Sequence, residues 1–238
     1  ISLLQKEMRP AFGCTEPIAL AYAAAKAASV LDEFPNHIHA RCSANIIKNV
    51  KSVVIPNSGG RKGLAAAAVL GAIVGHPERE LEVLESATDK DRKWLGTLLA
   101  ANFCTVELAE GVDNLYIEIM ATTDEHTAVV RIENAHTNIT YVSVDGNVIS
   151  ETINEIKEAE SSICPMTFDS IYEFAKAGDI SGILPSIKQQ VEYNTAISNE
   201  GLSNDYGANI GRLLLLDDET PSLETKCKAR AAAGSDAR

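Results

Sequence analysis

The sequence lacks the features that would place it at once among zinc-binding, redox or membrane proteins. Its 238 residues contain no Cys-x-x-Cys pair, which argues against a zinc ribbon and a thioredoxin-like centre. The apolar run after Pro17 reaches Lys26 after eight residues, whereas a membrane-spanning helix needs about 20. No signal-peptide pattern is visible. We therefore expect a cytoplasmic protein that does not act at a membrane.

Basic residues are also in short supply. Lys and Arg number 21 against 33 Asp and Glu, which gives a formal net charge of -12 at pH 7. Such a charge disfavours binding to nucleic acid or to an anionic membrane surface, so any anion must be held by a local site. The cysteines are few, odd in number and scattered, as is typical of free thiols in a reducing compartment. They are Cys14, Cys42, Cys104, Cys164 and Cys227.

The residues that are present predict an α+β fold. Apolar residues make up 45% of the chain and charged residues 23%, the balance of an ordinary globular protein. Two Ala-rich segments predict closely packed helices, and neighbouring alternating segments from Cys104 to Glu151 predict an antiparallel β-meander covered by them. Asp145-Gly146 predicts a hairpin turn. The expected elements are helices at 2–9, 16–31, 64–75, 79–87 and 89–101, and strands at 37–46, 52–56 and from Cys104 onward.

The pattern divides into two parts. Residues 1–154 predict an α+β domain with an antiparallel sheet, and residues 155–238 predict the start of a helical domain. The block 155–166 is the best candidate for a linker. The chain begins at Ile1 and stops at KARAAAGSDAR in the middle of a helical pattern, so we expect it to be part of a longer protein.

The segment Gly-Cys-Thr-Glu-Pro at 13–17 places a thiol directly before an Ala-rich helix. Thr15 is a suitable N-cap, and Pro17 is tolerated in a first turn. The helix dipole and the free amide hydrogens at such an end stabilise a thiolate, the form that attacks electrophiles or ligates metal. From these residues alone, Cys14 is a metal ligand, a nucleophile or a small buried cysteine beside a cap.

The segment Asn-Ser-Gly-Gly-Arg-Lys-Gly at 57–63 leads from an expected strand into the second Ala-rich helix. Exposed amides of Ser58, Gly59 and Gly60, with two basic residues behind them, would form an anion-binding nest for a carboxylate or phosphate. The spacing matches neither a P-loop nor a Gly-x-Gly-x-x-Gly motif. A plain tight turn is the alternative interpretation.

The segment Glu-Asn-Ala-His-Thr-Asn-Ile at 133–139 is a polar stretch between two expected strands. His136 could act as an acid or base near neutral pH, with Thr137 and Asn138 supplying hydrogen bonds. A hairpin loop rich in turn-forming residues explains the same stretch without any chemistry.

Five motifs taken together resemble the L-cysteine desulfidase family, which includes the UPF0597 group and is related to the iron-sulfur L-serine dehydratases. They follow the order of the family and span almost the whole chain. The motifs are GCTEPIALAYAAAKA, VVIPNSGGRKGLAAAAVLGAI, NAHTNI, NTAISNEGLSNDYGANIG and KARAAAGSDAR.

The resemblance implies an oxygen-sensitive lyase that converts L-cysteine to pyruvate, ammonia and hydrogen sulfide with a [4Fe-4S] cluster and without pyridoxal phosphate. It identifies Cys14 as one of three cluster ligands, the other two lying beyond Arg238. A cluster held by three thiolates leaves one iron free to act as a Lewis acid on the substrate. We therefore expect the 238 residues alone to lack the cluster and to be inactive.

Residue type, together with membership in these motifs, suggests which side chains would hold the amino acid. His136 is the candidate for proton transfer. The candidates for binding the carboxylate and ammonium groups of the substrate are Asn57, Ser58, Gly59, Gly60, Thr137 and Asn138.

Three alternatives stay open. An L-serine dehydratase would use the same mechanism, since the two substrates differ by one atom. Cys14 could instead be a nucleophile that needs no cluster. A non-catalytic domain that binds an amino acid, or that assembles through its Ala-rich helices, is the third alternative, and a homo-oligomer is compatible with it.

Overall fold

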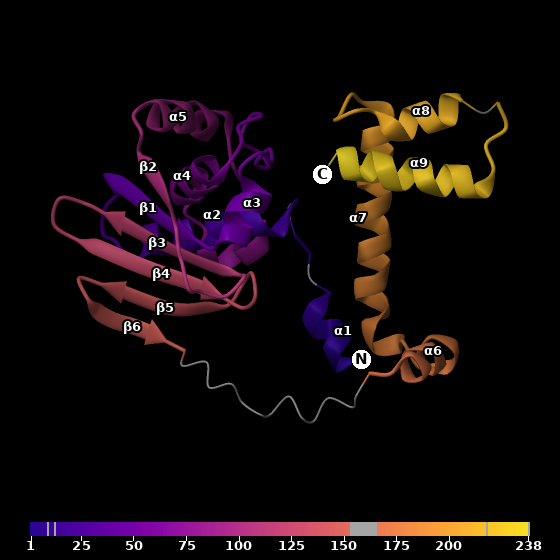
Figure 1. Ribbon diagram of the computed structural model, residues 1–238, viewed down its shortest axis with the longest axis horizontal. Helices are drawn as coiled ribbons and strands as arrows, with labels where there is room; N and C mark the ends of the chain where they lie inside the picture. The colour runs from indigo at the N-terminus through magenta and orange to yellow at the C-terminus, as the bar shows by residue number, and fades with distance from the viewer. Residues whose placement is uncertain (9, 12, 153–165, 218, 238) are drawn as a thin grey trace. The chain divides into compact units, whose positions relative to one another are not determined.

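The computed structural model describes residues 1–8, 10–11, 13–152, 166–217 and 219–237. The chain forms two compact units (Figure 1). The sheet unit is Ala11–Glu158, and the helical unit combines Ile1–Pro10 with Ala159–Arg238. Residues 155–165 of the expected linker, together with Cys164, lie outside the described residues.

The sheet unit contains a six-stranded mixed sheet in the order β2-β1-β3-β4-β5-β6. β3 to β6 are successive antiparallel neighbours, which confirms the expected meander. The expectation that β2 begins this meander was wrong, because β2 lies beside β1 and parallel to it. A parallel pair needs a long crossover, and the helices between β1 and β2 supply it. The strands are β1 (His37–Cys42), β2 (Cys104–Leu108), β3 (Tyr116–Thr122), β4 (Thr127–Glu133), β5 (Ile139–Val144) and β6 (Asn147–Glu151).

The turn between β5 and β6 is the hairpin that the sequence predicts. Asp145 and Gly146 both have positive φ angles, 53° and 75°. This pair of left-handed residues is what a two-residue hairpin loop needs to match the twist of its strands. The local sequence alone therefore determines this turn.

Two Ala-rich helices form the centre of the sheet unit, as expected. α2 (Thr15–Ser29) packs against β3 and β4, and α4 (Leu64–Val74) packs against α2, β1 and β2. A Cβ atom on Gly71 would collide with the main-chain carbonyl of Ala21, so the two backbones lie in contact. The small side chains allow the two helix backbones to approach closely, and Ala19, Ala21 and Ala23 are fully buried.

Several expected element boundaries differ in the structure. The first strand stops at Cys42 because Ser43 Oγ accepts a hydrogen bond from Ile46 N and caps α3 (Ala44–Val50). The expected strand 52–56 was wrong, because this segment forms only one bridge, between Val54 and Lys62. The turn at 57–60 folds the chain back on itself, so its two arms pair locally instead of joining the sheet.

The helices that follow α4 are partly as expected. α5 (Asp89–Ala100) begins at Thr88 with a capping box to Asp91. The expected helix 79–87 is instead the short 3-10 helix η1 (Pro77–Glu82), which Glu80 interrupts with a non-helical φ of 46°. Together these elements form the crossover between β1 and β2.

The helical unit has α7 (Leu184–Ser203) as its longest element, with α8 and α9 packed near its C-terminal end (Figure 1). α1 belongs to this unit, because Gln5 Nε2 donates a hydrogen bond to the carbonyl of Gly182. None of the helices in the described ranges combines the length and apolarity needed to cross a bilayer. The remaining elements are α1 (Ser2–Glu7), α6 (Phe168–Ala177), η3 (Ser181–Ile183), α8 (Ile210–Leu216) and α9 (Leu223–Asp236).

Candidate functional site

The candidate site lies where α2 begins. Cys14, and not Thr15, is the N-cap residue, so the expected cap at Thr15 was wrong by one position. Cys14 has an extended backbone, and its carbonyl accepts the first hydrogen bond of the helix from Ile18 N at 3.4 Å. The half-buried thiol therefore lies at the positive end of a 15-residue helix.

Glu16 connects this thiol to a neighbouring helix. Its Oε2 accepts hydrogen bonds from Cys14 Sγ at 3.2 Å and Thr15 Oγ1 at 3.3 Å, and its Oε1 accepts one from Asn49 Nδ2 of α3 at 3.3 Å. Burial acts to raise the pKa of Glu16, but hydrogen bonds from the Cys14 thiol, the backbone of Glu16 and the Thr15 hydroxyl, together with the charge of His136, bring it below its ordinary value. The carboxylate is therefore ionised near neutral pH.

His136 comes from the loop between β4 and β5. It is half-buried, and its charge is close enough to Glu16 to lower the pKa of that carboxyl group. Asn138 Nδ2 donates a hydrogen bond to the carbonyl of Glu133 at 2.9 Å, which closes the loop. The carbonyl of Thr137 accepts a hydrogen bond from Ile139 N at 3.2 Å. The loop is thus closed by its own groups, and it holds His136 near enough for its charge to act on Glu16.

The Gly-rich loop reaches the same helix start through Pro56. A Cβ atom on Gly13 would lie 2.6 Å from Pro56 Cγ, and Gly13 has a φ of +98°. Only a glycine satisfies both the left-handed backbone and the missing space at this position. Three motifs that are far apart in the sequence thus meet at the N-terminus of α2.

The side chains of the Gly-rich loop mainly hold the loop itself. Asn57 Nδ2 donates hydrogen bonds to the carbonyls of Leu84 and Glu85 at 3.1 and 2.9 Å. Ser58 is buried, and its Oγ donates to the carbonyl of Arg61 and accepts from Arg61 N. Asn57 and Ser58 are therefore engaged within the protein. The exposed residues of this loop are Gly59, Gly60, Arg61 and Lys62.

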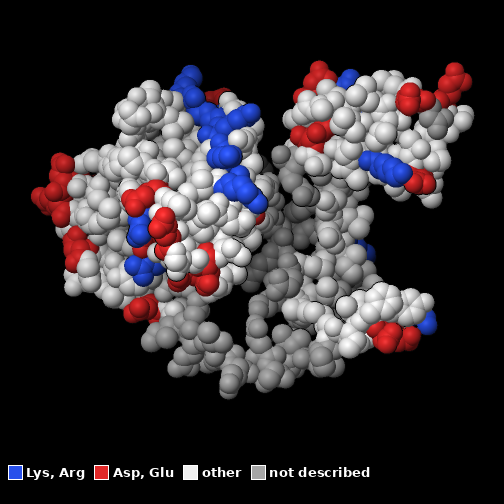
Figure 2. Space-filling model, viewed as in Figure 1, with Lys and Arg blue, Asp and Glu red and all other residues white. Residues whose placement is uncertain are grey.

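Positive charge gathers near this loop despite the net charge of the chain. Figure 2 shows a stripe of Lys and Arg on the sheet unit, over α3 and α5. Arg92 Nη1 donates a hydrogen bond to the carbonyl of Asn57 at 3.2 Å, and its Cδ lies beside Gly59. Because Arg92 is ion-paired with Asp89 at 2.9 Å, the exposed Arg61 and Lys62 of the loop itself supply the positive charge that favours an anionic group of a ligand.

The cysteines do not form a metal site within the described residues. Burial raises the pKa of Cys42 and of Cys104 to about 12, so both stay protonated at neutral pH. Cys227 is exposed and belongs to the helical unit. Across the described ranges, no group of three or more His, Cys, Asp and Glu side chains is placed to hold a metal ion. Cys14 supplies one thiol, and a cubane cluster does not fit the described residues by themselves.

The sequence predicted Cys14 and His136 as separate candidates and missed Glu16 and Asn49. Glu16 stands two residues after the cysteine, so its carboxylate was visible in the sequence, but its partners were not. Asn49 lies in α3, a helix that the sequence did not predict. The sequence around Asn49 contains no motif that would mark it as a site residue.

A second polar cluster lies on the face of the sheet opposite the core. Glu118 accepts hydrogen bonds from Arg41 Nη1 at 2.8 Å, Arg131 Nε at 2.6 Å and the Tyr116 hydroxyl at 3.0 Å. Burial acts to raise the pKa of Glu118, and these three donors lower it below its ordinary value. Arg131 also lies over the ring of Tyr141 at 4.6 Å. This cluster fixes the register of three strands.

The chain is similar to curated bacterial proteins along its whole length. It is 41% identical to a UPF0597 protein of Lachnoclostridium phytofermentans over 100% of the chain, and 44% identical to a UPF0597 protein of Finegoldia magna over 99% of it. A UPF0597 protein of Desulfitobacterium hafniense is 38% identical over 100% of the chain. The chain spans 57%, 57% and 56% of the lengths of these three relatives. Neither a family model nor a solved structure matches it.

Proposed function

Because this chain belongs to the UPF0597 family along its length, we propose that the protein is a lyase that eliminates the β-substituent of a small L-amino acid. The proposed reaction converts L-cysteine and water to pyruvate, ammonia and hydrogen sulfide. L-serine is the second substrate that the same site would accept. Water would then be eliminated in place of hydrogen sulfide, since only the leaving atom changes.

The observation that carries this proposal is the meeting of three motifs at the start of α2. Gly13 packs against Pro56 of the Gly-rich loop, Glu16 accepts a hydrogen bond from the Cys14 thiol, and the charge of His136 acts on Glu16. A carboxylate and an imidazole that influence each other, with the exposed residues Gly59 and Gly60 in the adjoining loop, are groups that a β-elimination can use.

Each group has a part in the proposed chemistry. The amides of Gly59 and Gly60, in the positive potential of the loop, receive the substrate carboxylate. His136 removes the proton from Cα, the Cβ–S bond breaks, and its electron pair leaves with the sulfur as sulfide. The resulting 2-aminoacrylate takes up water and releases ammonia to give pyruvate. The Glu16 carboxylate stabilises the imidazolium that forms when His136 takes this proton.

For the cofactor, we assign Cys14 as one ligand of a [4Fe-4S] cluster. The remaining ligands must come from residues other than those that the structure describes. When bound, such a cluster would supply Lewis acidity toward the substrate. The support for this assignment is the position of the donor: the half-buried Cys14 thiol lies at the positive end of a helix, which favours a thiolate, whereas the Glu16 carboxylate at 3.2 Å opposes one.

The test is anaerobic reconstitution of the full-length protein with iron and sulfide. Visible absorption and pyruvate formation from L-cysteine and L-serine are then measured. We expect a brown protein that forms pyruvate, and a Cys14→Ala variant that loses both colour and turnover. Cys227→Ala, which removes an exposed cysteine of the helical unit, is the matched control and should retain both.

Three results would contradict parts of the proposal. A colourless protein with full lyase activity would rule out the cluster. Activity of the 238-residue chain in air, abolished by alkylation of Cys14, would instead support a thiol nucleophile. Binding of an amino acid without turnover in the reconstituted full-length protein would support a non-catalytic role.

A further inference from the structure

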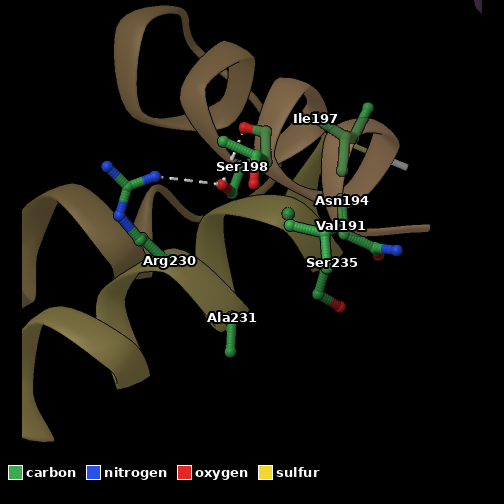
Figure 3. Close-up of a pocket in the computed structure, with 9 residues that line it drawn as sticks. Val191, Asn194, Ile197, Ser198, Arg230, Ala231 and Ser235 are labelled. Carbon is green, nitrogen blue, oxygen red and sulfur yellow. Dashed lines mark hydrogen bonds between the residues drawn. The ribbon is translucent and has the colours of Figure 1, made fainter. Parts of the chain in front are cut away.

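A groove lies within the helical unit, between α7 and α9 (Figure 3). Its volume is about 540 Å³, within the range of small-molecule sites. Two of the sequence motifs, NTAISNEGLSNDYGANIG and KARAAAGSDAR, supply most of its lining, and the chemistry proposed at Cys14 uses neither of them. The lining residues are Val191, Asn194, Thr195, Ile197, Ser198, Arg230, Ala231, Gly234 and Ser235.

Arg230 is the charged group of this groove, and it is held by neutral oxygens. Its Nη1 donates hydrogen bonds to Ser198 Oγ at 3.3 Å and Asn199 Oδ1 at 2.8 Å (Figure 3 shows the first of these). Ser198 is itself buried, and its hydroxyl donates to the carbonyl of Thr195 at 3.0 Å. The guanidinium is thus oriented by a side chain that the helix holds in place.

Arg230 is an exposed side chain whose surroundings differ from those of two other cations in the same unit. Arg212 forms an ion pair with Asp205, and Lys176 forms one with Glu173. In the part of the helical unit that the structure describes, no carboxylate forms an ion pair with Arg230. Its partners are neutral, so its positive charge is not cancelled locally and remains able to attract an anion.

We propose that this groove binds the carboxylate of a small organic acid, with Arg230 as the anchor. A guanidinium offers two parallel N–H groups that match the two oxygens of a carboxylate. In a chain with a net charge of -12, an anion needs such a local cation.

The rest of the lining carries no charge. Asn194 and Ser235 lie toward the other end of the groove, and their side chains point away from the Arg230 guanidinium (Figure 3). Val191 and Ile197 supply apolar surface for the carbon chain of the acid. The small residue Gly234 leaves the space open, because α9 approaches α7 there without a side chain.

The site goes beyond the function proposed at Cys14 and can be tested separately from it. Isothermal titration of the 238-residue chain with L-serine, pyruvate and inorganic phosphate measures the binding. We expect both carboxylates to bind, and Arg230→Gln to weaken this binding at least tenfold. Arg212→Gln, which alters an exposed arginine already paired with an acid, is the matched control and should bind as the unmodified chain does.

Asn199→Ala is a second variant that removes a partner of Arg230 from an exposed position, and it should weaken binding several-fold. Cys14→Ala should bind the carboxylates unchanged, so loss of lyase activity and loss of this site are distinguishable. The proposal would be overturned if the unmodified chain bound neither carboxylate, if Arg230→Gln bound them equally well, or if phosphate bound as tightly as they do.

Discussion

Cys14 Sγ lies 3.2 Å from Glu16 Oε2, and the same carboxylate accepts a hydrogen bond from Asn49 through its other oxygen. One side chain therefore connects the thiol at the start of α2 to helix α3. Because the pKa of Glu16 is lowered, this carboxylate is negatively charged at neutral pH. A negative charge beside the sulfur opposes the formation of a second negative charge on it.

The first prediction concerns this pair. In the cluster-free 238-residue chain, Glu16→Gln removes the charge and keeps a hydrogen-bonding side chain of the same size. The rate at which iodoacetamide alkylates Cys14 at pH 7 should rise several-fold, because the thiolate is the reactive form. Peptide mass spectrometry measures this rate. Alkylation of Cys227, far from this carboxylate in sequence and exposed, is the internal control and should not change. An unchanged or slower rate at Cys14 would show that Glu16 does not act on the thiol by charge.

The second prediction concerns the contact between Gly13 and Pro56. Both Gly13 and Gly60 have positive φ angles, so alanine at either position costs roughly 1–2 kcal/mol of backbone strain. A Cβ atom on Gly60 meets nothing within 4 Å, whereas one on Gly13 would collide with Pro56. Gly13→Ala should therefore lower the free energy of unfolding by about 1–3 kcal/mol more than Gly60→Ala does. Urea denaturation measures the difference, and equal losses would refute the role of the contact.

The third prediction concerns pH. Since the pKa of Glu118 in the folded protein is lowered from 4.5, its stabilising effect is fully present above that value. The effect is lost as the pH falls through the lowered pKa. Glu118→Gln should lower the free energy of unfolding by roughly 1–3 kcal/mol at pH 7, and by progressively less below pH 4.5.

The control for this prediction is Glu107→Gln, which changes an exposed glutamate of β2 that pairs with His39 at 3.1 Å. Glu107→Gln should change the free energy of unfolding at pH 7 by no more than about 0.5 kcal/mol. Denaturation of the three proteins from pH 7 to pH 3 measures both effects. A cost of Glu118→Gln that is independent of pH would mean that its ionised form does not carry the stabilisation.

The fourth prediction concerns the close approach of α2 and α4. Alanine normally stabilises a helix relative to glycine by roughly 0.5–1 kcal/mol. At Gly71 the added Cβ meets the backbone of Ala21, so Gly71→Ala should destabilise the protein by more than about 2 kcal/mol. Gly234 in α9 has only ordinary contacts at 3.7 Å, and Gly234→Ala should be neutral or stabilising. Thermal unfolding followed by circular dichroism separates the two, and a tolerated Gly71→Ala would contradict the packing described here.

Local sequence signals were sufficient for most elements of the fold. The hairpin at Asp145-Gly146, the buried Ala-rich helices and the meander from β3 to β6 follow from turn chemistry and periodicity, which act over a few residues. The position of β2 in the sheet could not be predicted in this way, because strand order depends on which edge of the sheet the crossover between β1 and β2 reaches. The segment 52–56 has a strand-like pattern, yet the turn after it binds its backbone locally.

The sequence by itself determined the chemical types of the candidate groups: a thiol before a helix, a Gly-rich loop and a histidine in a polar turn. Only the tertiary structure decided that Gly13 touches Pro56, that Glu16 lies between Cys14 and Asn49, and that the charge of His136 lowers the pKa of Glu16. These relationships join residues up to about 120 positions apart, and they depend on packing across the whole sheet unit. Residue types can be read directly from the sequence, whereas the proximity of residues far apart in the sequence depends on how the chain folds.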